Sequence, residues 1–230
     1  MNILDFVMDL IYPRDLTCVL CSEESDDELC DLCKGSIQFN IGRVCKACGR
    51  MITTDYGICR NCMSMERMFD YGVSVVTYDD YIKGLMYKLK YHNKRYIAHT
   101  MAKYILDYIL QLNLKEDFDG IIPVPLHENR LKNRGYNQAY LIAMFLSEMT
   151  GLKVYETIRR VVNTRPLNKM TREERSHILE DAFEVTRCME GNYILIDDIF
   201  TTGTTVNTCS KLLKASGVSQ ILVATFAVGE

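Results

Sequence analysis

The sequence predicts an α/β fold in which a mostly parallel sheet is flanked by helices and preceded by a small cysteine-rich module. Eight of the ten cysteines lie between Cys18 and Cys62. From Phe69 onward, apolar segments of strand length alternate with segments of helical period, which is typical of a parallel sheet covered on both faces. The 230 residues have room for one ordinary domain and a small module. We expect the module at 1–67 and the α/β domain at 68–230.

Composition and charge restrict the class of protein. Hydrophobic residues make up 48% of the chain and charged residues 25%, as in globular rather than disordered proteins. The net charge of −3 argues against a general polyanion-binding field, so affinity for nucleic acid or phosphate has to come from local patches. No apolar run approaches the ~18 residues of a membrane span, and the first residues contain Asp5 and Asp9 but no basic leader. We therefore expect a cytoplasmic protein.

The clustered cysteines form four CxxC pairs. Each pair places two thiols on one tight turn, and two pairs complete a tetrahedral Cys₄ site for zinc. A disulfide scaffold is the alternative, but a reducing cytoplasm disfavours it, and a redox motif is disfavoured because the pairs lack a βαβ context. We expect two zinc ions; sequential pairing is favoured, although the spacings also allow cross-braced pairing. The eight expected ligands are Cys18, Cys21, Cys30, Cys33, Cys45, Cys48, Cys59 and Cys62.

The first half of the α/β region begins with Val73–Tyr78, whose β-branched residues predict a strand. A short helix is expected at Tyr81–Lys90. A longer helix is expected at Ile97–Leu112, where apolar residues recur at helical spacing. Gly120–Pro125 predicts a buried strand that runs into a loop, and Asn137–Thr150 predicts a helix with one apolar face.

The second half continues the alternation. Lys153–Val162 predicts a strand with a broken period, and Asn192–Ile199 predicts a strongly apolar strand. Thr205–Ala215 predicts a helix, which Gly217 ends. Gln220–Val228 predicts the last strand.

The most informative segment joins the apolar strand at 192–199 to the following helix. Asp197 and Asp198 lie at the carboxyl end of this strand, where open α/β sheets bind ligands. The turn behind them offers backbone N–H groups, hydroxyls and a helix amino terminus, which together bind a phosphate. Two carboxylates beside a phosphate are favourable when they accept hydrogen bonds from ribose hydroxyls, so we predict a ribose 5-phosphate site. The turn residues are Thr201, Thr202, Gly203, Thr204 and Thr205.

Two other interpretations of this segment explain it less well. Capping of an ordinary helix accounts for one threonine but not for the adjacent aspartates. A Walker-type nucleotide loop needs a lysine before the hydroxyl residue, and Thr202-Gly203-Thr204 has none. The segment instead resembles the 5-phosphoribosyl-1-pyrophosphate (PRPP) motif of type I phosphoribosyltransferases, with four apolar residues, two acids and a small hydroxyl-rich loop. The resemblance implies a type I phosphoribosyltransferase-like sheet.

Further stretches extend the resemblance to the ComF family, which joins an amino-terminal zinc module to a phosphoribosyltransferase-like domain. Together with the cysteine pairs, these stretches cover nearly the whole chain, and they follow one another in the same order as in the family. The family is named for natural competence, the uptake and processing of single-stranded DNA, with a helicase as partner. The stretches are Leu89–Arg95, Ile122–His127, Arg130–Ala139, Asn163–Leu167 and Thr171–Arg175.

The resemblance implies roles for parts of the site. Asp197 and Asp198 would hold the ribose hydroxyls of PRPP, and the turn at 201–205 its 5-phosphate. Pro125–Arg134 would lie where the family's pyrophosphate loop lies, and Mg²⁺ would bridge the pyrophosphate oxygens. Residues 165–175 would form a mobile hood. Cations able to neutralise the pyrophosphate are Lys88, Lys90, Lys94, Arg95, Arg130, Lys132 and Arg134.

The hood departs from the family pattern at two positions. Leu167 stands where the family commonly has Gln, and Ile178 where it commonly has Asn. The activity implied is that of a phosphoribosyltransferase of unknown acceptor, because no residue stands out as a base. The alternative is a non-catalytic adaptor for single-stranded DNA and a helicase, with a site that senses PRPP or is vestigial.

The segment at 82–103 is basic and contains no acid. Interleaved tyrosines suggest a track for single-stranded DNA through phosphate contacts and stacking, in which Arg160 is a further candidate unless it serves the ligand site. The alternative is a solvated face, with several of the tyrosines in the core. The four residues proposed for nucleic acid are Lys88, Lys90, Lys94 and Arg95.

Overall fold

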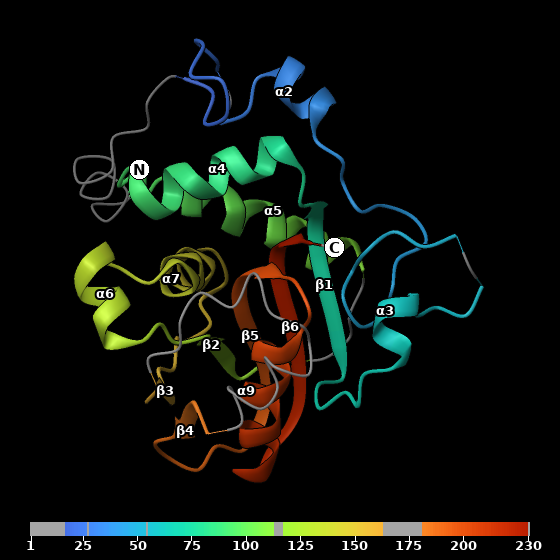
Figure 1. Ribbon diagram of the computed structural model, residues 1–230, viewed down its shortest axis with the longest axis vertical. Helices are drawn as coiled ribbons and strands as arrows, with labels where there is room; N and C mark the ends of the chain where they lie inside the picture. The colour runs from blue at the N-terminus through green and yellow to red at the C-terminus, as the bar shows by residue number, and fades with distance from the viewer. Residues whose placement is uncertain (1–16, 27, 54, 113–116, 163–180, 230) are drawn as a thin grey trace.

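The protein is built around a four-stranded, fully parallel sheet in the order β1-β6-β5-β2. These strands are β1 (Tyr71–Thr77), β2 (Gly120–Pro123), β5 (Gly191–Phe200) and β6 (Val218–Val228). Because all four strands are parallel, their carboxyl ends lie on one edge, the upper edge in Figure 1. The computed structural model describes residues 17–26, 28–53, 55–112, 117–162 and 181–229.

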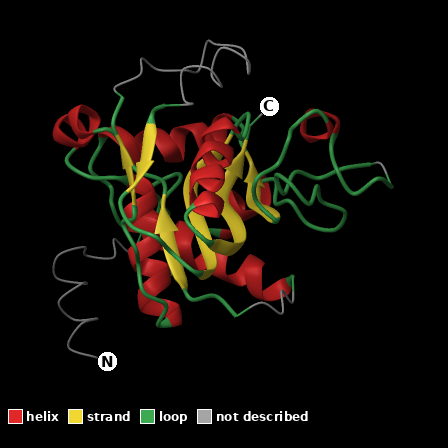
Figure 2. Ribbon diagram, turned by 90° about the horizontal axis from the view of Figure 1, so that it is seen from below, coloured by secondary structure: helices red, strands yellow, loops and turns green. Residues whose placement is uncertain are grey.

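Helices flank this sheet on both sides (Figure 2). The helices α5 (Ile97–Gln111) and α7 (Gln138–Thr150) pack on each other and on the sheet, and α4 (Asp80–Tyr91) packs on α5. Helix α9 (Thr204–Ala215) packs on β5 and β6, in front of them in Figure 1. The predicted α/β fold with a parallel sheet flanked by helices is therefore confirmed. None of the helices in the described part of the chain has the length and apolar character that crossing a bilayer requires.

The expected strand at 153–162 is divided in the structure. Val154 forms an isolated parallel bridge with Ile121 at the β2 edge. The chain then leaves the sheet, and β3 (Ile158–Arg160) pairs antiparallel with β4 (Phe183–Val185) in a separate ribbon. The broken apolar period reflects this change of partner. The hood expected at 165–175, with Leu167 and Ile178, lies outside the described residues.

The cysteine-rich region forms two small lobes that dock at different places (Figure 1). The first lobe, residues 17–37 with α2 (Asp31–Ser36), lies over α4. There Lys88 Nζ donates to the Leu20 carbonyl at 2.7 Å. We call it the first ribbon.

The second ribbon, residues 43–68 with α3 (Arg60–Met63), lies beside β1. The Gly72 N–H donates to the Lys46 carbonyl at 2.8 Å. Between the two ribbons, residues 38–40 run antiparallel along β1, with the Asn40 N–H donating to the Val75 carbonyl at 2.8 Å. The sheet edge is therefore covered by the cysteine-rich region.

Candidate functional site

The eight clustered cysteines form two groups, each with its four Sγ atoms within 4.8 Å of one another. The groups confirm sequential pairing: the first and second CxxC pairs come together, as do the third and fourth. Zinc bound tetrahedrally at about 2.3 Å from each sulfur has S–S edges of about 3.8 Å. The Cys21–Cys30 and Cys48–Cys59 sulfurs lie 3.8 and 3.7 Å apart. Both groups therefore fit a zinc ion.

The two cysteine groups differ in burial. All four thiols of the second group are buried, and the Cys59 N–H donates to Cys45 Sγ at 3.2 Å. Cys21 of the first group is exposed. The second group therefore lies inside the protein, against the sheet. Of the remaining cysteines, Cys209 is buried in α9 and Cys188 is exposed.

Asp197 and Asp198 lie near the carboxyl end of β5, and both are partly buried. The side chain of Asp198 is 15% exposed and forms an ion pair with Lys90 Nζ from the last turn of α4. The Asp198 N–H donates to Asp197 Oδ1 at 2.8 Å. The end of α4 thus supplies a cation to the acidic pair, a contact that the sequence analysis did not predict.

The pKa values of Asp197 and of Lys90, the cation beside the acidic pair, are both raised. Burial, and then the charge of Asp198, raises the pKa of Asp197 well above the ordinary carboxyl range, against the opposing hydrogen bond and the charge of Lys90. Burial lowers the pKa of Lys90, but the charge of Asp198 and their hydrogen bond raise it, and the net shift is upward. Lys90 therefore remains a cation, and Asp197 retains a proton more readily than a surface aspartate.

The turn after β5 has the backbone shape that the phosphate prediction requires. Gly203 adopts φ +74° immediately before α9 begins at Thr204. The hydroxyls of Thr202 and Thr204 lie 2.9 Å apart. The first N–H groups of a helix have no partners within it, and the helix dipole makes this end positive. The turn can therefore bind an anion next to Asp197 and Asp198.

Arg160 from β3 is a further cation at this site. Its side chain is buried and stacks over the Phe183 ring at 5.2 Å from the centroid. Burial, and then the charge of Arg130, lowers the pKa of Arg160, while Cys209 and Asp197 raise it. Arg160 is therefore close enough to Arg130 and Asp197 for their charges to act on it, as expected if it serves the ligand site. In the sequence, Arg160 is one of two adjacent arginines in an irregular strand. That pattern alone does not distinguish a role in the ligand site from a role in a nucleic-acid patch.

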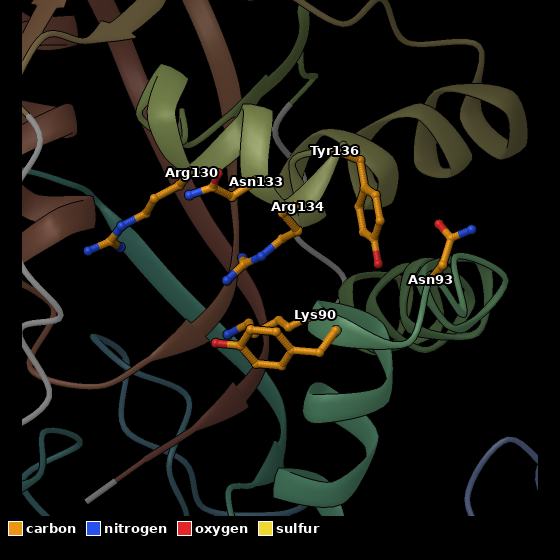
Figure 3. Close-up of a pocket in the computed structure, with 7 residues that line it drawn as sticks. Lys90, Asn93, Arg130, Asn133, Arg134 and Tyr136 are labelled. Carbon is orange, nitrogen blue, oxygen red and sulfur yellow. The ribbon is translucent and has the colours of Figure 1, made fainter.

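A cleft of about 420 Å³ opens between the end of α4 and α6 (Glu128–Arg134). In Figure 3 the Arg134 side chain extends toward Lys90, which joins the cleft to the acidic pair. The guanidinium of Arg130, one turn earlier on α6, has a pKa lowered by burial and by Arg134. The cleft is therefore suited to an anionic group. Its lining residues are Lys90, Tyr91, Asn93, Arg130, Asn133, Arg134 and Tyr136.

The segment expected to lie where the family's pyrophosphate loop lies contains the short helix α6. Nδ1 of His127 accepts from the Asn129 N–H at 3.1 Å and caps α6, which ends at Gly135 with φ +84°. Helical spacing puts Arg130 and Arg134 on one face, so both reach the cleft.

The basic segment does not form one uniform outer face. Lys88 donates to the first ribbon and Lys90 pairs with Asp198. Arg95 lies over the Tyr136 ring at 4.6 Å, and Lys94 lies 5.5 Å from the Tyr96 ring centroid.

The suggestion that several of the tyrosines belong to the core is wrong for three of them. Tyr81, Tyr87 and Tyr91 are 57%, 56% and 65% exposed. The reason is that Ile82, Leu85, Met86 and Leu89 fill the buried face of α4.

Comparison with known proteins agrees with this description. Residues 7–63 match the family described as a double zinc ribbon domain. The chain is 31% identical to competence protein F of Haemophilus influenzae over 190 residues, covering 78% of this chain and 82% of that protein. It is 26% identical to competence protein ComFC of Bacillus subtilis, covering 88% of this chain and 90% of that protein.

Two further likenesses complete the comparison. DNA utilization protein YhgH of Salmonella typhimurium is 26% identical, with 85% of this chain and 88% of that protein covered. A solved structure of Leishmania donovani UMP synthase aligns with a TM-score of 0.36 and 16% identity, over 62% of this chain and 28% of that one. From the identity and coverage shared with competence protein F, we conclude that the chain belongs to the ComF family of competence proteins.

Proposed function

We propose that this protein binds PRPP with Mg²⁺ at the carboxyl edge of its sheet and acts in competence-related handling of DNA. One observation carries the proposal: the acidic pair of β5 stands between the threonine turn and the cationic cleft. Asp197 and Asp198 would accept hydrogen bonds from the ribose hydroxyls, and the turn would hold the 5-phosphate. Arg130 and Arg134 would face the pyrophosphate. The competence names of the relatives support the cellular role.

The donor set is compatible with Mg²⁺. Magnesium prefers oxygen ligands and usually binds through one or two carboxylates together with substrate phosphates. Asp197 and Asp198 offer such oxygens, and Lys90 balances the charge of Asp198. When bound, the ion would neutralise the pyrophosphate, and the surrounding arginines would orient it.

The reaction suited to this arrangement is phosphoribosyl transfer. The bond between C1 of the ribose and the pyrophosphate oxygen would break, and pyrophosphate would leave with the electron pair. A nitrogen acceptor would bond to C1 through its lone pair and release its proton to solvent. Fixed charges around the leaving group would supply most of the catalysis, because positioning and electrostatics dominate such steps. Release of pyrophosphate from PRPP in the presence of candidate nitrogen acceptors tests for transfer. A protein that binds PRPP without releasing pyrophosphate would be a sensor.

The binding proposal is tested by calorimetric titration of PRPP with Mg²⁺. Wild type is compared with Asp197→Asn/Asp198→Asn and with a charge-matched control, Asp26→Asn/Asp107→Asn, in which both carboxylates are exposed. We expect micromolar binding by wild type and control, and at least about tenfold weaker binding by the site variant because charge-assisted hydrogen bonds are lost. Absence of binding by wild type, or equal affinity in both variants, would refute the proposal.

A second candidate function is binding of single-stranded nucleic acid along the outer face of α4. The exposed rings of Tyr87 and Tyr91 lie 4.9 Å apart, and His92 lies 5.3 Å from Tyr87. The Arg134 guanidinium lies 5.5 Å from the Tyr91 ring, at the mouth of the cleft. Aromatic side chains of this kind stack with bases, and nearby cations contact phosphates. A helicase that delivers or receives the strand would be the partner.

Fluorescence anisotropy with a labelled oligothymidine tests this candidate. Tyr87→Ala/Tyr91→Ala should weaken a salt-dependent affinity, because stacking contributes about 1–3 kcal/mol per base. Tyr56→Ala, an 80% exposed tyrosine of the second ribbon, is the control. Equal affinities of the two variants would exclude the α4 face as the contact.

A further inference from the structure

A second pocket, of about 310 Å³, lies where the threonine turn meets the second ribbon. It lies beyond the end of β6, whereas the cationic cleft lies toward α4 and α6. Thr201 and Thr202 of the turn line this second pocket, whereas the lining of the cationic cleft comes from 90–93 and 130–136. The polar residues that line this second pocket are Arg50, Arg60, Asn61, Ser64, Thr201 and Thr202.

Two arginines of the second ribbon give this pocket its charge. Arg50 donates through Nη2 to the carbonyl of Gly229, the residue beside the turn. Its Nε is buried and makes no hydrogen bond to any part of the chain that the structure describes. Arg60 follows the cysteine ligand Cys59 and is exposed at the pocket wall. The pocket therefore has two arginines and two threonines of the turn in its lining.

The second ribbon also holds the turn in place. Oδ1 of Asn207, in the first turn of α9, accepts from the Met68 N–H at 2.8 Å, and its Nδ2 donates to the Glu66 carbonyl at 3.0 Å. The Met65 sulfur packs against Gly203. The two walls of the pocket are thus fixed relative to each other, so the pocket is formed before any ligand enters.

We propose that the second ribbon forms part of the ligand site, with Arg50 and Arg60 binding the phosphate ester group that the threonine turn cradles. This inference rests on the proposed function. It assigns the two ends of the ligand to different parts of the protein. The pyrophosphate end would face Lys90, Arg130 and Arg134. The 5-phosphate end would be held between the turn and the zinc module, whose guanidinium groups match phosphate oxygens in charge and geometry.

A competing role for these arginines is charge compensation. A zinc ion with four thiolates carries a net charge of −2, and Arg60 is adjacent to one ligand in sequence. Under that role the arginine would support zinc binding and leave phosphate affinity unchanged. Zinc content and ligand affinity therefore have to be measured together.

The experiment titrates two probes, PRPP with Mg²⁺ and ribose 5-phosphate, into the full-length zinc-loaded protein. Arg60→Ala is compared with Arg43→Ala, a control in the same ribbon whose guanidinium pairs with the exposed Asp55. We expect Arg60→Ala to weaken both probes by the same factor, about tenfold, with two zinc ions retained. Arg134→Ala should weaken PRPP but change ribose 5-phosphate affinity less than twofold. Arg60→Lys should recover part of the loss.

The outcomes are distinguishable. If wild type binds PRPP but Arg60→Ala binds ribose 5-phosphate as tightly as Arg43→Ala does, the inference fails and the proposed function stands. If Arg60→Ala loses zinc along with phosphate affinity, the arginine belongs to the metal site and the inference fails. If wild type binds neither probe, the proposed function and the inference fail together.

Discussion

The threonine turn depends on a glycine that no other residue can replace without cost. Gly203 adopts φ +74°, and a Cβ atom there would lie 2.5 Å from Phe200 Cζ and 3.2 Å from Met65 Sδ. The Phe200 ring is 3% exposed and makes an edge contact with Phe69 at 6.3 Å, so it has little room to move. We therefore expect Gly203→Ala to disturb both the turn and the packing beneath it.

The cost has two separable parts. A left-handed conformation costs a residue with a Cβ about 1–2 kcal/mol, and forcing an atom into a packed core costs about 1–3 kcal/mol. The sum for Gly203→Ala is about 2–5 kcal/mol. Gly151→Ala is the matched control, because Gly151 ends α7 with φ +76° and has nothing within 4 Å of an added Cβ. Gly151→Ala should lose only the unfolding free energy that the left-handed conformation costs.

The assay is urea unfolding of the zinc-loaded protein followed by far-ultraviolet circular dichroism, since the chain has no tryptophan to report by fluorescence. PRPP titration of both variants gives a second comparison, in which only Gly203→Ala should bind more weakly. Losses of unfolding free energy that agree within about 0.5 kcal/mol would show that the turn is not packed as described.

Two further predictions concern the metal and the acidic pair. Cys59→Ser and Cys21→Ser should each lower zinc content by one ion, but only Cys59→Ser should markedly weaken PRPP binding, because the second ribbon holds Asn207 and Gly203; equal affinities would contradict this coupling. Asp197→Asn should stabilise the protein more at pH 8 than at pH 5.5. The pKa of Asp197 is raised from 3.8 to about 8. Between pH 5.5 and 8 the folded protein therefore keeps a proton that the unfolded chain has already lost, so wild type loses stability as the pH rises through this range. Thermal unfolding at both pH values should show a difference of at least about 1.4 kcal/mol, equivalent to one pKa unit. A pH-independent difference would exclude the shift.

The parts of the site that follow from the sequence are those encoded by neighbouring residues. The apolar run into Asp197 and Asp198, and the turn behind it, can be recognised because strand, acids and helix start are contiguous. The same holds for the CxxC pairs. The zinc pairing needed the structure, because the spacings alone permit both arrangements.

Contacts between distant segments were not predictable in this way. Nothing local to Lys90 indicates a partner at Asp198. The position of Arg160 in a ribbon outside the main sheet, where the charge of Asp197 acts on it, could not be predicted either. The exposure of Tyr87 and Tyr91, by contrast, could have been inferred. The apolar stripe of Ile82, Leu85, Met86 and Leu89 already fills the inner face of α4, which leaves the tyrosines outside.

The strand-like segment at 38–40 has a consequence for any attempt to study the α/β part alone. A fragment starting at residue 68 would lose the hydrogen bonds that this segment makes to β1 through the Val75 carbonyl and the Thr77 N–H. An uncovered, apolar edge strand recruits strands from other chains and promotes aggregation. We therefore expect such a fragment to aggregate through β1 even when its core folds, so that the cysteine-rich region acts like a chaperone that is part of the same polypeptide.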